Sequence, residues 1–168
     1  MGSVNFDDGV YVNTLPDIRY WAGRMREEGV RPELEIFEGG MIHNVALLGE
    51  EGVLTPPFSY GLALGFRGAL PATPQALTFL SGLLPAGAGW GIVHHGMRDL
   101  SLLAMAGAMG AALLRVGFED SIHYAPGRTA QTNTELVERL VALVEAMGRE
   151  IATPAEAREM LCLPAGRR

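Results

Sequence analysis

The sequence predicts an α/β fold built on a parallel sheet of about four strands. Apolar, strand-like runs alternate with segments whose apolar residues recur every three or four positions, as on the buried face of a helix. The segments between the strands are as long as helices, and parallel strands need such crossovers. Right-handed crossovers leave two architectures, an open doubly wound sheet or a segment of a (β/α)8 barrel whose sheet edges need a partner.

The length supports one domain. The chain has 168 residues, within the usual range of about 100–200 residues for a domain. A complete (β/α)8 barrel typically needs about 250 residues. Residues 1–168 are therefore expected to form a single domain. A domain of this length can be a complete open sheet but only part of a (β/α)8 barrel.

Four segments are the predicted strands, at residues 31–38, 58–66, 90–94 and 112–118. The second is almost continuously apolar, as expected of a parallel strand covered on both faces. Strand side chains alternate between faces, so Leu34 and Ile36 share one face in the first segment while Glu33 and Glu35 share the other. That second face therefore carries two carboxylates.

Capping residues and prolines mark the helices. Thr14, Thr73, Thr132 and Thr153 each precede an apolar periodic segment, and three of these segments have proline in their first turn. Helices are expected at about residues 16–28, 41–50, 74–84, 101–110, 132–148 and 154–161. Residues 121–131 are expected to form a polar loop.

Composition argues against several classes of protein. A formal net charge of −6 and the lack of a basic stripe argue against a nucleic-acid partner. Cys162 is the one cysteine, so neither a disulfide framework nor a cysteine zinc site is expected, and a reducing, cytoplasmic setting follows. The uncharged tract at residues 100–114 is shorter than the roughly 20 residues of a membrane span. The first residues lack the basic and apolar regions of a signal peptide.

Candidate functional residues gather near the expected carboxyl ends of the strands, where α/β proteins bind ligands. They are Glu35, Glu38, Arg67, His94, His95, Glu119 and Asp120. Arg115 shares a predicted strand face with Glu119 and is an available counterion for Glu33 and Glu35, which would otherwise repel each other. Glu35 lies nearer the carboxyl end of the strand and is the better candidate for proton transfer, whereas Glu33 fits a structural ion pair better. The arrangement of Arg115 and these carboxylates fits a purely structural internal ion pair equally well.

The histidines are weaker candidates. His94 and His95 are adjacent, so on a strand they point to opposite faces and cannot easily bind one metal ion. His43, on an expected helix, and His123, in an expected loop, fit ordinary polar positions. Cys162 fits a packed apolar position better than a nucleophile.

Four stretches together resemble the β-keto acid cleavage enzymes, at residues 2–6, 32–38, 115–120 and 152–158. The most specific part is the third stretch, which reads Arg-x-Gly-x-Glu-Asp, where x is any residue. Order and spacing match along the whole chain. The resemblance implies a zinc-dependent (β/α)8 barrel that condenses a small β-keto acid with acetyl-CoA and releases acetoacetate and a new acyl-CoA.

The resemblance also implies roles for individual residues. Glu119 matches a zinc ligand, and Asp120 matches the base that deprotonates the keto acid. Arg115 and Glu35 match residues that assist this base. These roles are chemically coherent, because Zn2+ polarises a keto oxygen as a Lewis acid and a nearby carboxylate removes a proton.

The chain also departs from the family pattern. The family's other zinc ligands form a His-x-His pair on an early strand, and no such pair occurs here. A glycine-x-glycine-arginine turn is replaced by residues 94–98, and Ser121 stands where asparagine is common. The match starts at the end of the family's fourth strand, so the resemblance implies that this chain is the C-terminal half of a (β/α)8 barrel.

Three hypotheses follow from these observations. In the first, the chain is the C-terminal half of such an enzyme, from a truncated or split reading frame, and works with a complementary N-terminal half or as a homo-oligomer. In the second, it is a non-catalytic half-barrel that self-associates or binds a partner through its open sheet edges. In the third, it is an unrelated doubly wound domain that binds a small acid or a nucleotide.

Overall fold

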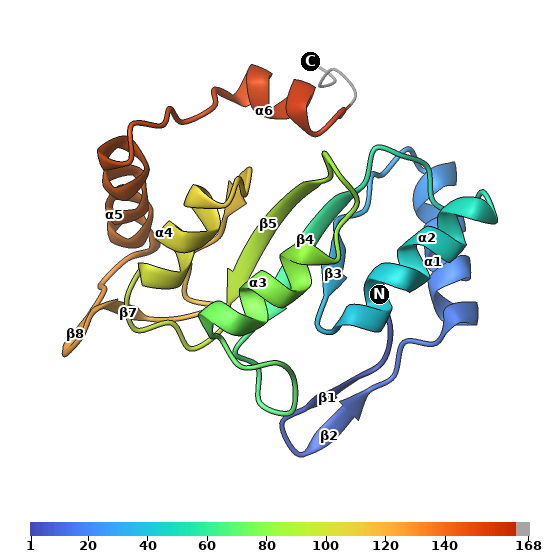
Figure 1. Cartoon of the computed structure of the whole chain (residues 1–168), viewed down its shortest axis with the longest axis horizontal. Helices are drawn as coiled ribbons and strands as arrows, with labels where there is room; N and C mark the ends of the chain where they lie inside the picture. The colour runs from blue at the N-terminus through green and yellow to red at the C-terminus, as the bar shows by residue number, and fades with distance from the viewer. Residues whose placement is uncertain (164–168) are drawn as a thin grey trace.

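A four-stranded parallel sheet, covered by helices on one face, forms the centre of the computed structural model, which describes residues 1–163 (Figure 1). The strands are β3 (Leu34–Ile36), β4 (Ser59–Leu64), β5 (Gly89–His94) and β6 (Leu113–Leu114). They are joined by α2 (Gly39–Glu50), α3 (Pro74–Gly82) and α4 (Ser101–Ala108). The expected α/β fold with four parallel strands is confirmed.

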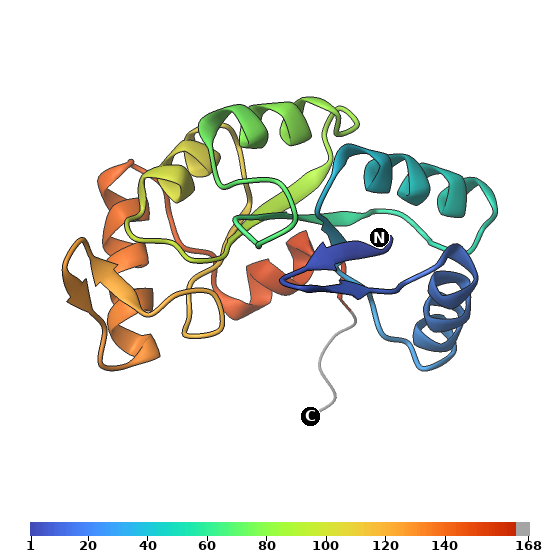
Figure 2. The same cartoon turned by 90° about the horizontal axis from the view of Figure 1, so that it is seen from below.

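The strand order decides between the two architectures. The strands lie side by side in the order β3–β4–β5–β6, which is their order along the chain. Right-handed crossovers then place α2, α3 and α4 on the same face, as seen from below in Figure 2. A doubly wound sheet instead reverses its strand order at a switch point. The fold is therefore that of a (β/α)8 barrel segment.

The core lies between the sheet and these helices. Register pairs Leu34 with Tyr60, and Ile36 with Leu62, so these side chains leave the sheet on one face. They pack against the apolar sides of the helices. The residues of this core that have no exposed surface are Ile36, Val45, Leu48, Leu62, Leu64, Leu77, Leu80, Ile92, Leu103 and Ala106. Burial of this apolar surface is the main stabilising term of the fold.

The opposite face of the sheet carries glycines in its two central strands. Register aligns Glu35 with Gly61, Gly61 with Gly91, and Gly91 with Leu113. In a closed barrel this face would point inward. Two glycines in the central strands leave room above the sheet for longer side chains from its edges.

Two β-hairpins extend the sheet domain and were not expected from the sequence. The first joins β1 (Val4–Phe6) to β2 (Gly9–Tyr11) and precedes α1 (Leu15–Glu27). The second joins β7 (His123–Ala125) to β8 (Arg128–Thr129), where a polar loop was expected. Both are too short and irregular to show a clear period of two.

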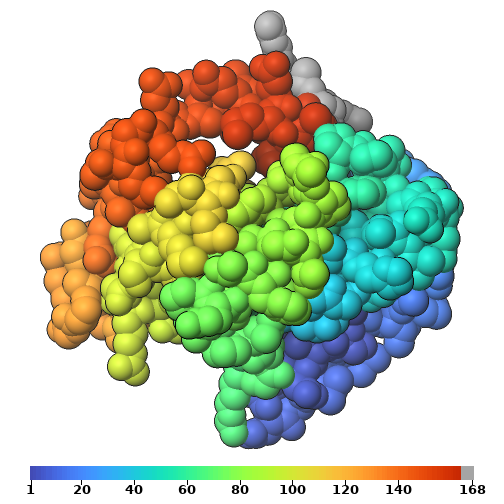
Figure 3. Space-filling view, in the orientation of Figure 1, coloured from blue at the N-terminus to red at the C-terminus, as the bar shows by residue number. Residues whose placement is uncertain are grey.

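The chain continues into α5 (Asn133–Ala146) and α6 (Pro154–Met160). Leu136 and Leu140 are the buried residues of α5, whereas α6 has no buried residue. The space-filling view shows the α5–α6 segment arching past the body of the molecule (Figure 3). Among the described residues, no helix has the length and apolar character of a membrane span.

The fourth strand is the main correction to the expected boundaries. It was expected to reach residue 118 but ends at Leu114. Gly117 then takes a φ of 157°, and the Phe118 amide donates to Asn133 Oδ1 at 2.9 Å. The strand alternation expected to align Arg115 with Glu119 therefore does not apply, because both residues lie in a loop.

Candidate active site

Arg115 is the centre of a cluster of three carboxylates at the carboxyl end of the sheet. Its Nε and Nη2 donate to the two carboxylate oxygens of Asp120 at 2.8 and 3.1 Å. Nη2 also lies 2.9 Å from Glu119, and Nη1 lies 3.8 Å from Glu35. One guanidinium therefore links the loop after β6 to β3.

Glu35 and Arg115 come from opposite edges of the four-stranded sheet. They approach each other because the sheet curves and because Gly61 and Gly91 place no side chain between them. A Cβ at Gly61 would come within 2.9 Å of Glu33 Oε1, and one at Gly91 within 2.8 Å of the Leu113 Cβ. A larger residue at Gly91 would therefore disturb the floor beneath the cluster, whereas one at Gly61 would displace the exposed Glu33 side chain.

Asp120 is held in place from several directions. It is 4% exposed, and its carbonyl accepts a hydrogen bond from the Gly96 amide at 2.8 Å. The neighbouring Ser121 is also buried, and its hydroxyl donates to the Met97 carbonyl. These contacts tie the Asp120 loop to the loop after β5, so the buried carboxylate has a defined orientation.

Glu35 is the carboxylate best suited to carry a proton. Burial raises the pKa of Glu35, the negative charges of Glu33 and Glu119 raise it further, and the charges of Arg115 and the Met1 ammonium oppose them. Its side chain is still 44% exposed. A carboxyl group with a raised pKa and solvent access can take up and release a proton.

Other sequence candidates have mainly structural roles in this chain. The Glu38 carboxylate caps α2 by accepting from the Gly40 amide at 3.0 Å. Arg67 forms an exposed ion pair with Asp8 at 3.0 Å. Glu33 lies above Gly61 and is exposed.

The two adjacent histidines lie in different surroundings. His95 stacks on Phe66 with ring centroids 4.6 Å apart. His94 lines a cavity of about 360 Å³ beside the first residues of α3 and α4, together with Arg98 and Asp99. His43 is exposed on α2, His123 lies in β7 and Cys162 is exposed.

An aromatic row beside the cluster was missed in the sequence. Phe37 and His95 directly follow β3 and β5, Phe66 follows β4 after one intervening glycine, and Phe6 joins them from β1. The ring centroids of Phe6 and Phe37 both lie 5.2 Å from that of Phe66. A ring within two residues of the end of each of three parallel strands was the available signal, because the carboxyl ends of such strands meet at one rim.

The donor set for a metal is incomplete among residues 1–163. No group of three histidine, cysteine, aspartate or glutamate side chains is placed there to hold a metal ion. Glu119 offers a single carboxylate, 85% exposed and paired with Arg115. Catalytic zinc is held by three protein ligands with a fourth position open, so the described residues do not fit zinc by themselves.

The fold and the cluster together define a segment of a (β/α)8 barrel with acidic and basic groups at its strand ends. The family model for the beta-keto acid cleavage enzymes matches residues 1–163. The chain belongs to this family.

Curated relatives agree with this assignment, and a solved structure agrees with the fold. A 3-keto-5-aminohexanoate cleavage enzyme from Fusobacterium nucleatum is 38% identical over 96% of this chain and 59% of its own length. A 3,5-dioxohexanoate:acetyl-CoA acetone transferase from Paraburkholderia graminis is 32% identical over 95% of this chain and 52% of its own length. The apo structure of ObcA superposes with a TM-score of 0.81 at 20% identity, over 96% of this chain and 43% of the other. The chain thus spans about half the length of these proteins.

Proposed function

We propose that this chain forms one half of the active site of an acetyl-CoA-dependent enzyme that cleaves a small β-keto acid. The reaction would convert the keto acid and acetyl-CoA into acetoacetate and a new acyl-CoA. Family membership supports the reaction class. The observation that carries the proposal is the Arg115 guanidinium, which contacts Glu35, Glu119 and Asp120 at the rim where barrel enzymes place their sites.

In this proposal Asp120 is the base that removes a proton from the keto acid. Its orientation by Arg115 and its burial support the role, because a base must be held within hydrogen-bond reach of the proton that it takes. Glu35 is the second carboxylate, suited by its raised pKa to exchange that proton with solvent. Arg115 positions both groups, and its charge favours the negative charge that develops on the deprotonated substrate.

Zinc enters the proposal only through Glu119. We assign this residue the place of one metal ligand, and its exposure leaves the carboxylate accessible. Bound zinc would polarise the keto oxygen of the substrate. Further ligands are not available among residues 1–163, so the roles of Asp120, Glu35 and Arg115 are derived without it.

A fusion protein tests the proposal. The portion of the F. nucleatum relative outside the match would be joined to this chain, and acyl-CoA formation from acetyl-CoA and a panel of β-keto acids would be measured. Asp120→Asn should lower kcat by about 100- to 10,000-fold, the usual contribution of a general base, with bound zinc unchanged. Glu119→Gln should lose zinc as well as turnover.

Two results would contradict these roles. Equal loss of zinc in Asp120→Asn and Glu119→Gln would overturn the separation between base and ligand. The matched control is Glu138→Gln, which removes an exposed carboxylate from α5. This variant should keep full activity. A fusion that binds zinc but forms no acyl-CoA from any tested keto acid would reject the proposed reaction.

A further inference from the structure

We propose that the aromatic row of Phe6, Phe37, Phe66 and His95 binds the tail of the keto acid and favours a tail that is apolar and uncharged. The tail is the group attached to the keto carbon on the side away from the carboxylate. This inference rests on the proposed function, because it names the substrate class of the same site. It can be tested without turnover, since binding of a substrate analogue needs no acetyl-CoA.

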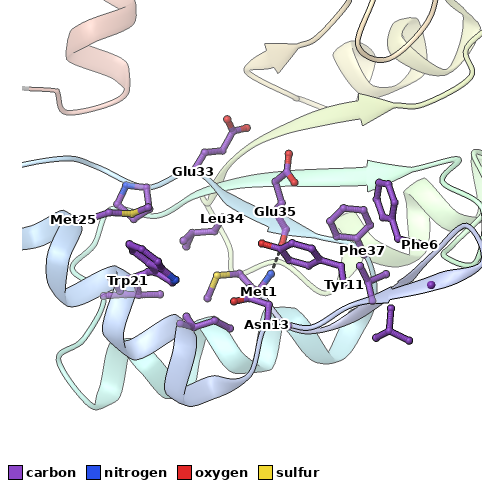
Figure 4. Close-up of a pocket in the computed structure, with 18 residues that line it drawn as sticks. Met1, Phe6, Tyr11, Asn13, Trp21, Met25, Glu33, Leu34, Glu35 and Phe37 are labelled. Atoms are coloured by element: carbon purple, nitrogen blue, oxygen red, sulfur yellow. Dashed lines mark hydrogen bonds between the residues drawn. The ribbon is translucent and has the colours of Figure 1, made fainter.

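The row begins beside the carboxylate of the Arg115 cluster that lies on β3. Phe37 follows Glu35 by two residues, which is about 7 Å along an extended chain, and side chains two residues apart leave such a chain on the same side. Figure 4 shows the rings of Phe37 and Phe6 on the side of β3 to which Glu35 points. A substrate whose reacting carbon lies at the cluster therefore has the row within reach of its tail.

Backbone contacts hold the row in place. The His95 amide donates to the Leu64 carbonyl at 2.9 Å, and the Asp7 amide donates to the Arg67 carbonyl at 3.1 Å. Gly65 has a φ of 89° and passes so close to His95 that a Cβ at this glycine would overlap the His95 carbonyl oxygen. These contacts join the segments that carry three of the four rings. A bound tail thus meets rings that are already in position, which reduces the entropic cost of binding.

The rings form a continuous apolar surface and no cage. The centroid of Phe66 lies 5.2 Å from those of Phe6 and Phe37, which are 6.4 Å apart, and 4.6 Å from that of His95. Rings at these separations are in contact, so they leave no gap between them like those of the aromatic cages that bind quaternary ammonium groups. Phe6 is 41% exposed, and the surface is therefore open to a ligand.

The charged side chains next to the rings are paired or lie in solvent. Glu35 is paired within the Arg115 cluster at 3.8 Å, and the Glu38 carboxylate caps α2. Arg67 pairs with Asp8 at 3.0 Å, and Asp7 is exposed in the turn between β1 and β2. A charge on the tail would lose water at the row without gaining a partner there, and burial of an unpaired charge is costly. An apolar tail avoids this cost.

Binding of stable substrate analogues to the full chain tests the proposal. The probes are 3-hydroxybutanoate, 3-hydroxyhexanoate and 5-amino-3-hydroxyhexanoate, which share the carboxylate and differ in the tail. Each titration is followed by NMR of the ring resonances of the row. 3-Hydroxyhexanoate should bind about tenfold more tightly than 3-hydroxybutanoate, because two additional CH2 groups leave water. The amino analogue should bind no more tightly than 3-hydroxybutanoate, because its ammonium group has no partner at the row.

Two variants test the row itself. Phe66→Ala removes the central ring, and Phe6→Ala removes the ring of an exposed hairpin residue, which places a smaller demand on folding. Each should reduce the tenfold preference for the longer tail to about threefold or less, because less apolar surface is covered. The matched control is Phe79→Ala, which removes an exposed ring from α3. This variant should keep the full preference.

Three results would overturn the proposal: equal binding of the three acids, binding of none of them, or a preference that survives both Phe66→Ala and Phe6→Ala. Adenosine 5′-monophosphate is a further probe. If it shifts the ring resonances more strongly than 3-hydroxyhexanoate does, the row belongs to the nucleotide of coenzyme A and the proposal is wrong. Failure of the proposed reaction is seen separately, because a fusion protein without turnover rejects that reaction and leaves the measured tail preference unchanged.

Discussion

Arg115 is the residue on which the local structure depends most. Asp120 is almost fully buried, and both of its carboxylate oxygens accept hydrogen bonds from this one side chain. Arg115→Met should lower the free energy of unfolding by about 3 kcal/mol, because removing one partner leaves a buried charge unpaired. Urea denaturation followed by circular dichroism measures the change.

Arg128→Met is the comparison for this prediction. Arg128 pairs with Glu135 at 3.2 Å on the surface, and exposed pairs contribute about 1 kcal/mol or less. Equal losses in the two variants would show that burial of Asp120 does not govern the strength of the Arg115 pair.

His94 should make the folding stability of the chain depend on pH, and a variant of this residue can measure its contribution separately. Burial lowers the pKa of His94, and the charges of Asp99 and Asp120 oppose this effect. Its Nδ1 is buried without a hydrogen-bond partner. Between the lowered pKa and the ordinary value of about 6.5, the unfolded chain binds more protons than the folded chain, so stability rises as pH rises through this window.

His94→Gln should therefore reduce the loss of Tm on acidification below about pH 6.5. The measurement is the difference in Tm between parent and variant across the acidic range, which cancels the contributions of the carboxylates. His43→Gln removes an exposed histidine from α2 and serves as the control. A constant difference in Tm at every pH would contradict the prediction.

At the level of elements, the last two helices have similar caps but different burial. The Thr132 hydroxyl accepts from the Glu135 amide at the start of α5, and Thr153 and Glu156 form a capping box at the start of α6. Thr132→Ala should cost about 1 kcal/mol of global stability, because α5 packs through Leu136 and Leu140. Thr153→Ala should leave global unfolding unchanged, since α6 has no buried residue.

Two measurements separate these effects. Urea unfolding reports the global change, and hydrogen exchange of the α6 amides should show faster local opening in Thr153→Ala. A global loss of about 1 kcal/mol from Thr153→Ala would mean that α6 unfolds together with the sheet.

For most helices and strands, the local sequence pattern was sufficient to predict the element. Periodicity and capping residues predicted the four parallel strands and all six helices, α6 from its capping box and proline alone because it has no buried residue. The boundaries were less accurate. α2 begins at Gly39 rather than near residue 41, since the Glu38 side chain reaches forward to cap it. The two hairpins were missed because their strands of two or three residues carry too little pattern.

At the level of the whole molecule, the isolated chain should bind zinc weakly. Glu119 is the assigned ligand, and residues 1–163 contain no group of three donors. One carboxylate cannot define a tetrahedral site. After dialysis the chain should hold far less than one zinc per molecule by mass spectrometry, and EDTA should leave its Tm unchanged. Near-stoichiometric zinc would contradict the prediction.

The sequence by itself determined the parallel α/β fold, most of the helix starts and the motif that places Arg115 beside Glu119 and Asp120. These features are local, because they follow from periodicity, capping residues and short spacing. Only the tertiary structure decided that Arg115 binds both oxygens of Asp120 and approaches Glu35 from the far edge of the sheet. The same is true of the aromatic row. These features depend on sheet curvature and strand register, which bring together residues from distant segments and which no local pattern encodes.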